Sequence, residues 1–191
     1  MTSNEIALQV IRLLEKHQIP YMLVGSYSSN AFGIPSSTQD AAFVIELGPQ
    51  SISSVAKDLL PEIVLDPQLA FETATMTSRF VAKHTKSGFK VELFLLGDNS
   101  YDRQRFQRRQ RQPFLDTTAV LPTVEDVIIQ KLRWFGRIRR AKDLDDARNV
   151  IAVRHSGLDL PYIRQWCDQH GTRELFEQIL LEAQRFEEEH P

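Results

Sequence analysis

Apolar side chains near the N-terminus recur at helical spacing and then give way to a short, continuous apolar run. Residues 4–18 carry one apolar stripe that ends before Pro20, which is typical of an amphipathic helix. Residues 21–25 are apolar and end in glycine, and the small residues 26–33 can begin a helix at once. The pattern therefore predicts a helix, a strand, a tight turn and a second helix.

The middle of the chain continues with short strand and helix patterns. Residues 41–47 are strand-like, and residues 49–60 return to a helical pattern. Residues 80–84 and 89–96 flank Lys86-Ser87-Gly88 closely enough to form a hairpin, which we expect on an antiparallel edge of the sheet. The order strand, helix, strand, helix predicts a layered sheet with helices and excludes a β-sandwich.

Nearly all of the sequence from Thr123 onward has a helical pattern. Thr123 with Asp126 fits a capping box at the start of a helix, and Asp159 and Gly171 mark the ends of two further helices. We therefore expect an α+β fold in which a mixed sheet flanked by helices forms a core of residues 1–120. A C-terminal helical region, residues 121–191, is expected to pack on this core.

The amino-acid composition indicates an ordinary globular protein. The 191 residues are 42% hydrophobic and 25% charged, as in an ordinary globular domain. The single Cys167 cannot form an internal disulfide, and no cluster of cysteines and histidines has zinc-ligand spacing. No apolar run approaches the ~18 residues of a membrane span, and the polar N-terminus has no signal-peptide core behind it. We therefore expect a cytoplasmic protein without a membrane partner.

The net charge of −2 conceals a basic segment. Eleven of the 23 lysines and arginines lie between Arg103 and Lys142, where there are only three acidic residues. The densest part contains Arg103, Arg105, Arg108, Arg109 and Arg111. These guanidinium groups either bind phosphate or form a solvated helix face. Arginine suits phosphate because it can donate two parallel hydrogen bonds to it.

A few polar residues carry the candidate chemistry. Gly25 and Ser26 follow the first strand, where glycine lets backbone approach a phosphate and the helix start favours anions. Asp40 begins the second strand, and Glu92 lies inside an apolar hairpin strand. Burying a lone charge costs several kcal/mol, so Glu92 must point to the wetter face, toward a cation or a hydrogen-bond donor. A solvated residue on an edge strand is the alternative interpretation.

The segments Val24-Gly25-Ser26, Thr38-Gln39-Asp40 and Val91-Glu92-Leu93 resemble the core of the DNA polymerase β-like nucleotidyltransferase superfamily. In that superfamily a Gly-Ser turn precedes a strand with an Asp-x-Asp pair, and a neighbouring strand supplies a third carboxylate. The resemblance implies that Asp40 and Glu92 hold Mg²⁺ or Mn²⁺ on one sheet face, since strand side chains alternate. It also implies that Gly25 and Ser26 bind nucleotide phosphates.

The second half of the chain is similar to the C-terminal helices of bacterial AbiEii-like nucleotidyltransferases. The likeness covers PTVEDVIIQKLRW at residues 122–134, KDLDD at residues 142–146 and LDLPYIRQW at residues 158–166. In such proteins the lysine matching Lys131 faces the nucleotide phosphates, and an acid matching Asp143 or Asp146 lines the same cleft. A surface lysine, and acids that complement the dipole of a helix N-terminus, are the alternative interpretations.

The second acid of the Asp-x-Asp pair is missing, because Ala42 holds a methyl group at that position. Magnesium can be held by one or two carboxylates together with substrate phosphates, so nucleotide binding can survive while turnover falls. Either the enzyme has degenerated naturally, or the alanine is a deliberate inactivating substitution.

The resemblance implies metal-dependent transfer of a nucleoside monophosphate from an NTP to an acceptor. Asp40, Glu92 and Lys131 would be the catalytic residues, with Glu92 also deprotonating the acceptor and Lys131 stabilising phosphate charge. A tRNA or a protein side chain is the expected acceptor. The expected setting is the toxin of a bacterial toxin–antitoxin pair, with an antitoxin protein as partner. The alternatives are a non-catalytic protein that binds a nucleotide, an RNA or a partner protein, and a structural subunit of an assembly.

Overall fold

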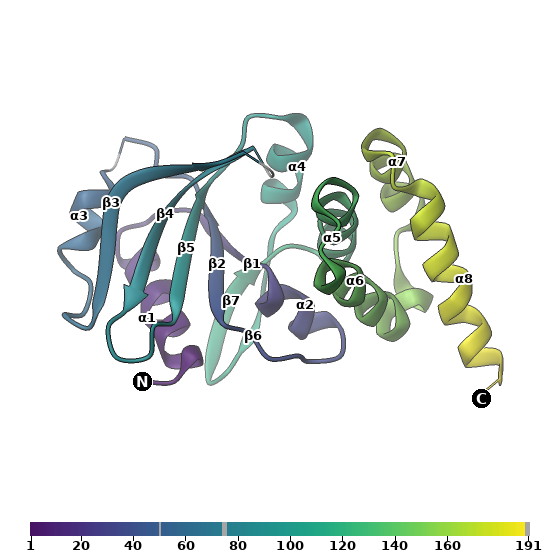
Figure 1. Ribbon diagram of the computed structural model, residues 1–191, viewed down its shortest axis with the longest axis horizontal. Coiled ribbons are helices and arrows are strands. Elements are labelled where there is room, and N and C mark those ends of the chain that lie inside the picture. Colours follow the sequence, from purple (N-terminus) through teal and green to yellow (C-terminus); the bar gives the residue numbers. More distant parts are fainter. Residues whose placement is uncertain (50, 74–75, 190–191) are drawn as a thin grey trace. The chain divides into compact units, whose positions relative to one another are not determined.

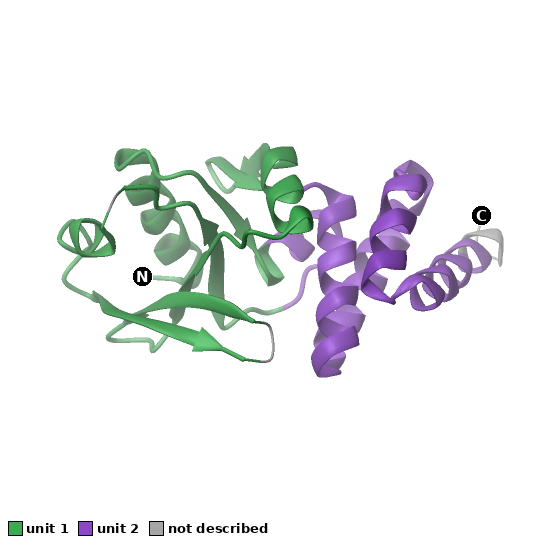
Figure 2. Ribbon diagram, turned by 90° about the horizontal axis from the view of Figure 1, so that it is seen from above, with its two compact units in different colours: residues 1–27, 37–121 green, residues 28–36, 122–191 purple. Residues whose placement is uncertain are grey.

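The computed structural model describes residues 1–49, 51–73 and 76–189. This part of the chain divides into two compact units, coloured separately in Figure 2. The sheet unit comprises residues 1–27 and 37–121, and the helical unit comprises residues 28–36 and 122–191. The early segment 28–36 thus belongs to the helical unit, although no local sequence pattern predicts this.

Within its described residues the sheet unit contains a five-stranded mixed sheet with the order β1-β2-β5-β4-β3 (Figure 1). The strands are β1 (Tyr21–Val24), β2 (Asp40–Ile45), β3 (Ile63–Glu72), β4 (Thr77–His84) and β5 (Lys90–Leu95). β2 and β5 run parallel, and the other neighbouring strands are antiparallel. The expected α+β fold with a mixed sheet is confirmed.

Helices surround this sheet, and apolar side chains cover both of its faces. The helices are α1 (Ser3–Lys16), α2 (Ser26–Phe32), α3 (Ile52–Ala56) and α4 (Ser100–Arg108), of which α2 runs on into the helical unit. One face packs with α1 in the larger core cluster, which includes Ile6, Leu14, Leu23, Phe43 and Leu93. The opposite face has a smaller cluster that includes Met22, Val24, Ala42, Val44 and Phe94. The candidate carboxylates belong to the second face.

Some expected elements differ in place or length. The β4–β5 hairpin is not at an edge, because β5 lies between β2 and β4 and the edge strand is β3. Among the described residues of the helix predicted over 49–60, only α3 is helical, because serine and β-branched residues are weak helix formers; residue 50 lies outside the described residues. Neither β3 nor the separate hairpin of β6 (Gln110–Phe114) and β7 (Thr117–Leu121) was expected.

The helical unit follows its sequence pattern closely. After β7 the chain forms α5 (Val124–Ile138), α6 (Ala141–Arg154), a short 3-10 helix (His155–Gly157), α7 (Leu160–His170) and α8 (Arg173–Glu189). The side chains of Thr123 and Asp159 cap α5 and α7, and Gly171 ends α7 at φ 68°. The helix ends predicted at these three residues are confirmed. The Asp126 carboxylate accepts a hydrogen bond of 3.0 Å from the Thr123 hydroxyl, which is not the backbone contact of the predicted capping box. None of the described helices is long and apolar enough to cross a lipid bilayer.

Candidate functional site

The turn between β1 and α2 exposes backbone directly beside β2. Gly25 has φ +67°, a conformation that glycine adopts without a Cβ penalty. A Cβ at position 25 would lie 3.4 Å from the Cβ of Ala42. Gly25 therefore keeps open the space above Ala42, and Ser26 starts α2 from the same turn.

The register of the sheet aligns the three positions of the candidate metal site. Ala42 is the direct partner of Glu92, and Asp40 is the partner of Lys90, on the parallel strands β2 and β5. Paired residues share a face, and so do residues two apart on one strand. Asp40, Ala42 and Glu92 therefore point to the same face, and neighbouring strands are only ~4.8 Å apart.

A cation already lies beside one of these carboxylates. The Nε atom of Arg79, on β4, is 3.4 Å from Oε1 of Glu92, and the two side chains are 26% and 20% exposed. That Nε atom is buried and has no hydrogen bond within the described part of the chain. The guanidinium group also lies 5.5 Å from the centroid of the Phe94 ring. Arg79 thus partly neutralises Glu92 without forming a hydrogen bond through Nε to any described residue.

Tyr27 contributes a second polar group near Asp40. Its hydroxyl donates a hydrogen bond of 3.1 Å to Oδ1 of Asn4. Burial, and to a lesser extent the negative charge of Asp40, raises the pKa of Tyr27 to about 12. The phenol therefore stays protonated at neutral pH and remains a hydrogen-bond donor.

Two carboxylates on one face can hold one divalent ion, but they are a small ligand set. No group of three or more acidic, histidine or cysteine side chains with metal-binding geometry occurs among the residues that the structure describes. Mg²⁺ commonly takes one or two carboxylates and completes its shell with water and substrate phosphates. Asp40 and Glu92 fit that arrangement for a single ion shared with a nucleotide.

The helical unit contains the other predicted site residues, and it brings them together. The ammonium group of Lys131, on α5, lies 3.1 Å from Oδ1 of Asp143 and 2.6 Å from Oδ2 of Asp146, both on α6. These three side chains are 4%, 0% and 5% exposed. Arg140 adds two hydrogen bonds of 2.8 Å to Asp143. Lys131 is therefore the centre of a buried ion-pair network and not a surface lysine.

The basic segment is largely paired within the sheet unit. Arg103 binds Glu46 and Asp98 at 2.7 and 2.6 Å, and the buried Arg105 binds Asp102 at 3.0 Å. Arg111 binds Glu15 at 3.0 Å.

Arg109 uses its own helix in a similar way. It donates a hydrogen bond to the carbonyl of Phe106 and lies 4.0 Å from that ring's centroid, and burial lowers its pKa. The segment therefore stabilises the fold through internal contacts, in addition to any role at the surface.

Sequence reasoning missed the cations around the carboxylates. Arg79 lies on β4, and Lys90 becomes the neighbour of Asp40 only through the β2–β5 register. A lysine at the start of an apolar strand was the available signal for Lys90. No local pattern marks Arg79, because its partner Glu92 is set by the pairing of β4 with β5.

No family model matches the chain, and no curated protein matches its sequence. Solved structures do match its fold. The enzyme ANT(2″)-Ia in complex with adenylyl-2″-tobramycin is 9% identical, with a TM-score of 0.60 over 91% of this chain and 99% of that chain.

Two further structures show the same likeness. An antigenic nucleotidyltransferase-like protein from Paracoccidioides brasiliensis is 14% identical, with a TM-score of 0.56 over 94% of both chains. The lincosamide antibiotic adenylyltransferase LnuA, bound to lincomycin, is 12% identical, with a TM-score of 0.52 over 78% of this chain and 96% of that chain. With its mixed sheet, its glycine turn and this shared architecture, the chain has the nucleotidyltransferase fold.

Proposed function

We propose that this protein binds an NTP with a divalent ion at the face of Asp40 and Glu92, and transfers the nucleoside monophosphate to an acceptor. The observation that carries the proposal is the β2–β5 register, in which Asp40, Ala42 and Glu92 share one face next to the Gly25 turn. Carboxylates at these positions are oxygen ligands of the kind that Mg²⁺ and Mn²⁺ prefer.

The residues of the sheet unit divide the work of the reaction. Asp40 and Glu92 would hold the ion, which when bound neutralises phosphate charge and orients the nucleotide. The glycine turn and the start of α2 offer backbone N–H groups to the phosphates. In the transfer step the acceptor oxygen bonds to the α-phosphorus, pyrophosphate leaves, and Glu92 accepts the acceptor's proton.

Ala42 limits this chemistry. A carboxylate at position 42 would lie between Asp40 and Glu92 on the same face, where the superfamily has its second acid. Without it, the site has two carboxylates and the nearby guanidinium of Arg79, so one ion and one arginine would face the phosphates. We therefore expect nucleotide binding with slow transfer.

The acceptor is the most open part of the proposal. We propose an RNA such as tRNA, or a protein side chain, in the setting of a bacterial toxin–antitoxin pair with an antitoxin protein as partner. The similar structures add a second class of acceptor, since their names describe an adenylylated tobramycin and a lincomycin-bound adenylyltransferase. They also favour ATP as the first donor to test.

The buried ion pairs of the helical unit change the role that we propose for Lys131. Lys131 and Arg140 together balance the charges of Asp143 and Asp146, and the lysine and both aspartates are buried. We propose that this cluster positions α5 and α6, and that a phosphate contact of Lys131 would require exchange of one aspartate for the nucleotide. Lys131 is thus a positioning residue in this proposal.

A second candidate function is non-catalytic binding of a nucleotide or a partner protein. The methyl group of Ala42 opposite Glu92, with Arg79 beside the same carboxylate, specifically favours this candidate. A guanidinium group can hold a phosphate without supporting transfer.

The test is the Ala42→Asp variant. We expect it to raise nucleotide transfer by about two orders of magnitude or more, because a restored metal ligand contributes several kcal/mol at the transition state and each ~1.4 kcal/mol is tenfold in rate. The assay measures incorporation of label from α-³²P-ATP into tRNA, protein and antibiotic acceptors with Mg²⁺ or Mn²⁺.

Asp40→Ala in the parent protein serves as the blank, because it removes the one carboxylate that β2 has there. Transfer that stays at the blank level in Ala42→Asp with every acceptor, while the NTP still binds, would establish the non-catalytic candidate. Equal activity of the parent protein and the Ala42→Asp variant would contradict the role assigned to position 42.

A further inference from the structure

Two lysines lie directly opposite each other on the sheet unit, next to the candidate metal site. Lys83 of β4 is the sheet partner of Lys90 of β5, and Lys90 is in turn the partner of Asp40 of β2. The strands β2, β5 and β4 are neighbours in the sheet (Figure 1). Because directly paired residues point to the same face, Lys90 and Lys83 extend the row of Asp40 across that face.

Neither ammonium group is neutralised by the described part of the chain. Lys83 and Lys90 are both exposed, and no ion pair joins either of them to a described residue, although Asp40 is adjacent to Lys90. Like charges directly opposite each other on neighbouring strands destabilise a sheet. An anionic ligand between the two lysines would remove this repulsion.

Two acidic side chains of this face have other partners. Glu92 lies 3.4 Å from Arg79. Asp66, which is the sheet partner of Val81 one row further along, accepts a hydrogen bond of 2.9 Å from the backbone of Gln68. These acids therefore leave the positive charge of the lysine pair uncompensated.

Apolar side chains lie beside the lysines on the same face. Val64 of the edge strand β3 is the sheet partner of Lys83 and is 57% exposed. Val81 lies two residues from Lys83 on β4 and is half-buried. A nucleic-acid strand combines charged phosphates with the flat faces of its bases. Val64 and the lysines together offer an apolar and a cationic surface that suit such a strand.

The candidate metal site lies between the lysines and the glycine turn. Gly25 directly follows β1, on one side of Asp40, and Lys90 and Lys83 lie on the other side, toward β4. In the proposed function the glycine turn holds the phosphates of the nucleotide donor. The lysines are therefore on the side from which an acceptor would approach the ion.

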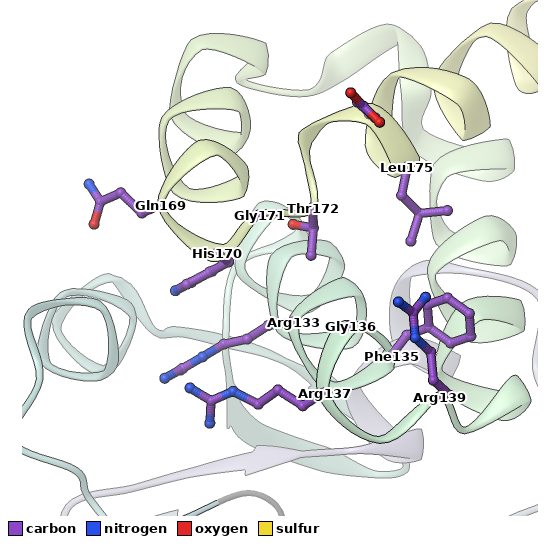
Figure 3. A pocket seen from close by; sticks show the side chains of 11 residues that line it. Arg133, Phe135, Gly136, Arg137, Arg139, Gln169, His170, Gly171, Thr172 and Leu175 are labelled. Atoms are coloured by element: carbon purple, nitrogen blue, oxygen red, sulfur yellow. The ribbon is translucent and has the colours of Figure 1, made fainter.

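The helical unit has a basic hollow of about 390 Å³, but its arginines do not converge (Figure 3). Arg133 and Arg137 extend in the same direction, whereas Arg139 points to the opposite side. Arg133, Arg137 and His170 also have interaction partners. This hollow therefore lacks the uncompensated pair of cations that the sheet unit has.

We propose that Lys83 and Lys90 bind the phosphate backbone of an RNA acceptor, whose reactive end would lie at Asp40 and Glu92. This assignment rests on the proposed function, because the transfer reaction is what makes a bound RNA an acceptor. Lysine binds phosphate as a compact point charge. An acceptor with several ammonium groups would instead meet two like charges. Among the acceptors considered above, the lysine pair therefore selects RNA.

Fluorescence anisotropy of a short labelled single-stranded RNA measures this site without the transfer reaction. EDTA is present and nucleotide is absent, so the result does not depend on an ion at Asp40 and Glu92. We expect the double variant Lys83→Gln with Lys90→Gln to bind RNA about tenfold more weakly. The slope of log affinity against log salt should fall by about 1.4, since each phosphate contact with a single strand contributes about 0.7.

The matched control is the double variant Lys16→Gln with Lys57→Gln. It removes the same charge from exposed positions at the ends of α1 and α3, which pack in the core cluster of the opposite sheet face. RNA affinity of this control should stay within about twofold of the parent's, because the far face makes no phosphate contact. The melting temperature of Lys83→Gln with Lys90→Gln should not fall, because the substitutions remove a repulsive pair.

A second titration, with Mn²⁺ and a non-hydrolysable ATP analogue, separates the acceptor from the donor. We expect Lys83→Gln with Lys90→Gln to weaken analogue binding much less than RNA binding. An equal loss for both ligands would place the lysines at the phosphates of the donor and overturn the proposal. Failure of the parent protein to bind the analogue would contradict the proposed function, whereas the RNA titration would still decide the role of the lysines.

The remaining outcomes also decide the assignment. Unchanged RNA affinity in the lysine double variant, or no saturable RNA binding by the parent protein, overturns it. An equal loss in the Lys16 and Lys57 control would reduce the effect to net charge, with the same consequence. A phosphate-free acidic peptide that displaces the RNA at equal charge concentration would assign the lysines to a protein acceptor instead.

Discussion

At the scale of single residues, Glu92 has two competing partners. The proposed reaction needs its carboxylate for a divalent ion, whereas the structure pairs it with Arg79 at 3.4 Å. Because this ion pair lacks hydrogen-bond geometry at Nε, the guanidinium is a replaceable partner. Under the proposed function we therefore expect Arg79 to set how strongly the free protein attracts a metal ion, and its charge to become available to phosphates when a nucleotide binds.

Replacing Arg79 with glutamine should strengthen Mn²⁺ binding in the absence of nucleotide. We expect an affinity increase of about three- to tenfold, because a positive charge beside the ion is removed in a partly solvated site. Isothermal titration with MnCl₂ measures it. Lys86→Gln is the matched control, since Lys86 pairs with Glu62 in an exposed turn. A decrease in Mn²⁺ affinity in Arg79→Gln would contradict this competition.

At the scale of elements, the pairing of α5 with α6 depends on a buried charge network. Lys131 reaches from α5 to two aspartates of α6, and all three side chains are nearly inaccessible to solvent. A buried ion pair contributes little net stability, but removing one partner destabilises the protein strongly, because an uncompensated charge remains buried. The network thus fixes the register of the two helices.

Lys131→Met should destabilise the helical unit by about 3–5 kcal/mol. Both tryptophans, Trp134 and Trp166, lie in this unit, so urea denaturation followed by tryptophan fluorescence reports on it. Lys142→Met, which removes a half-exposed partner 3.7 Å from Asp146, should cost less than about 1 kcal/mol. A similar loss of stability in the two variants would show that the burial of Lys131 does not determine the cost of removing its charge.

The elements that could be predicted from sequence are those with local signals. The apolar run before Gly25 and the caps at Thr123, Asp159 and Gly171 mark their own boundaries, and each lies where expected. β3 was missed because it is an exposed edge strand with Pro67 inside it, at an irregularity between Asp66 and Ala70.

The hairpin of β6 and β7 was missed for a related reason. β6 reads Gln-Arg-Gln-Pro-Phe, without an alternation of apolar and polar residues. In the candidate site, the spacing of the motifs pointed to Asp40 and Glu92, whereas Arg79 and Lys90 are neighbours only through strand pairing. The burial of Lys131 likewise depends on α6 and has no signature within α5.

At the scale of the whole molecule, the chain enters the helical unit after the first strand of the sheet and returns to the sheet unit before the second. Residues 28–36 belong to that unit, where Arg154 donates a hydrogen bond of 3.2 Å to the carbonyl of Phe32 and Lys142 one of 3.1 Å to Ser36. A Cβ at Gly33 would lie 2.9–3.0 Å from the backbone of Asn149 and Val150. This segment and α6 are therefore closely packed, and neither unit is a continuous piece of sequence.

Gly33→Ala should therefore destabilise the helical unit by about 1–3 kcal/mol, since the added methyl group meets backbone atoms that cannot rotate away. Urea denaturation with tryptophan fluorescence measures the change. Gly157→Ala is the control, because no atom lies within 4 Å of its added Cβ. A stability in Gly33→Ala equal to that of the control would mean that residues 28–36 do not pack tightly on α6.

The central claim is that a divalent ion and a nucleotide bind together at the face of Asp40 and Glu92. The most direct measurement is paramagnetic broadening of backbone amide signals by Mn²⁺ with a non-hydrolysable ATP analogue. We predict that Gly25, Ala42 and Glu92 broaden at substoichiometric Mn²⁺, and that Asp40→Asn abolishes the effect. Sharp signals at these residues in the parent protein, or equal broadening in Asp40→Asn, would contradict the assignment of this face as the nucleotide site.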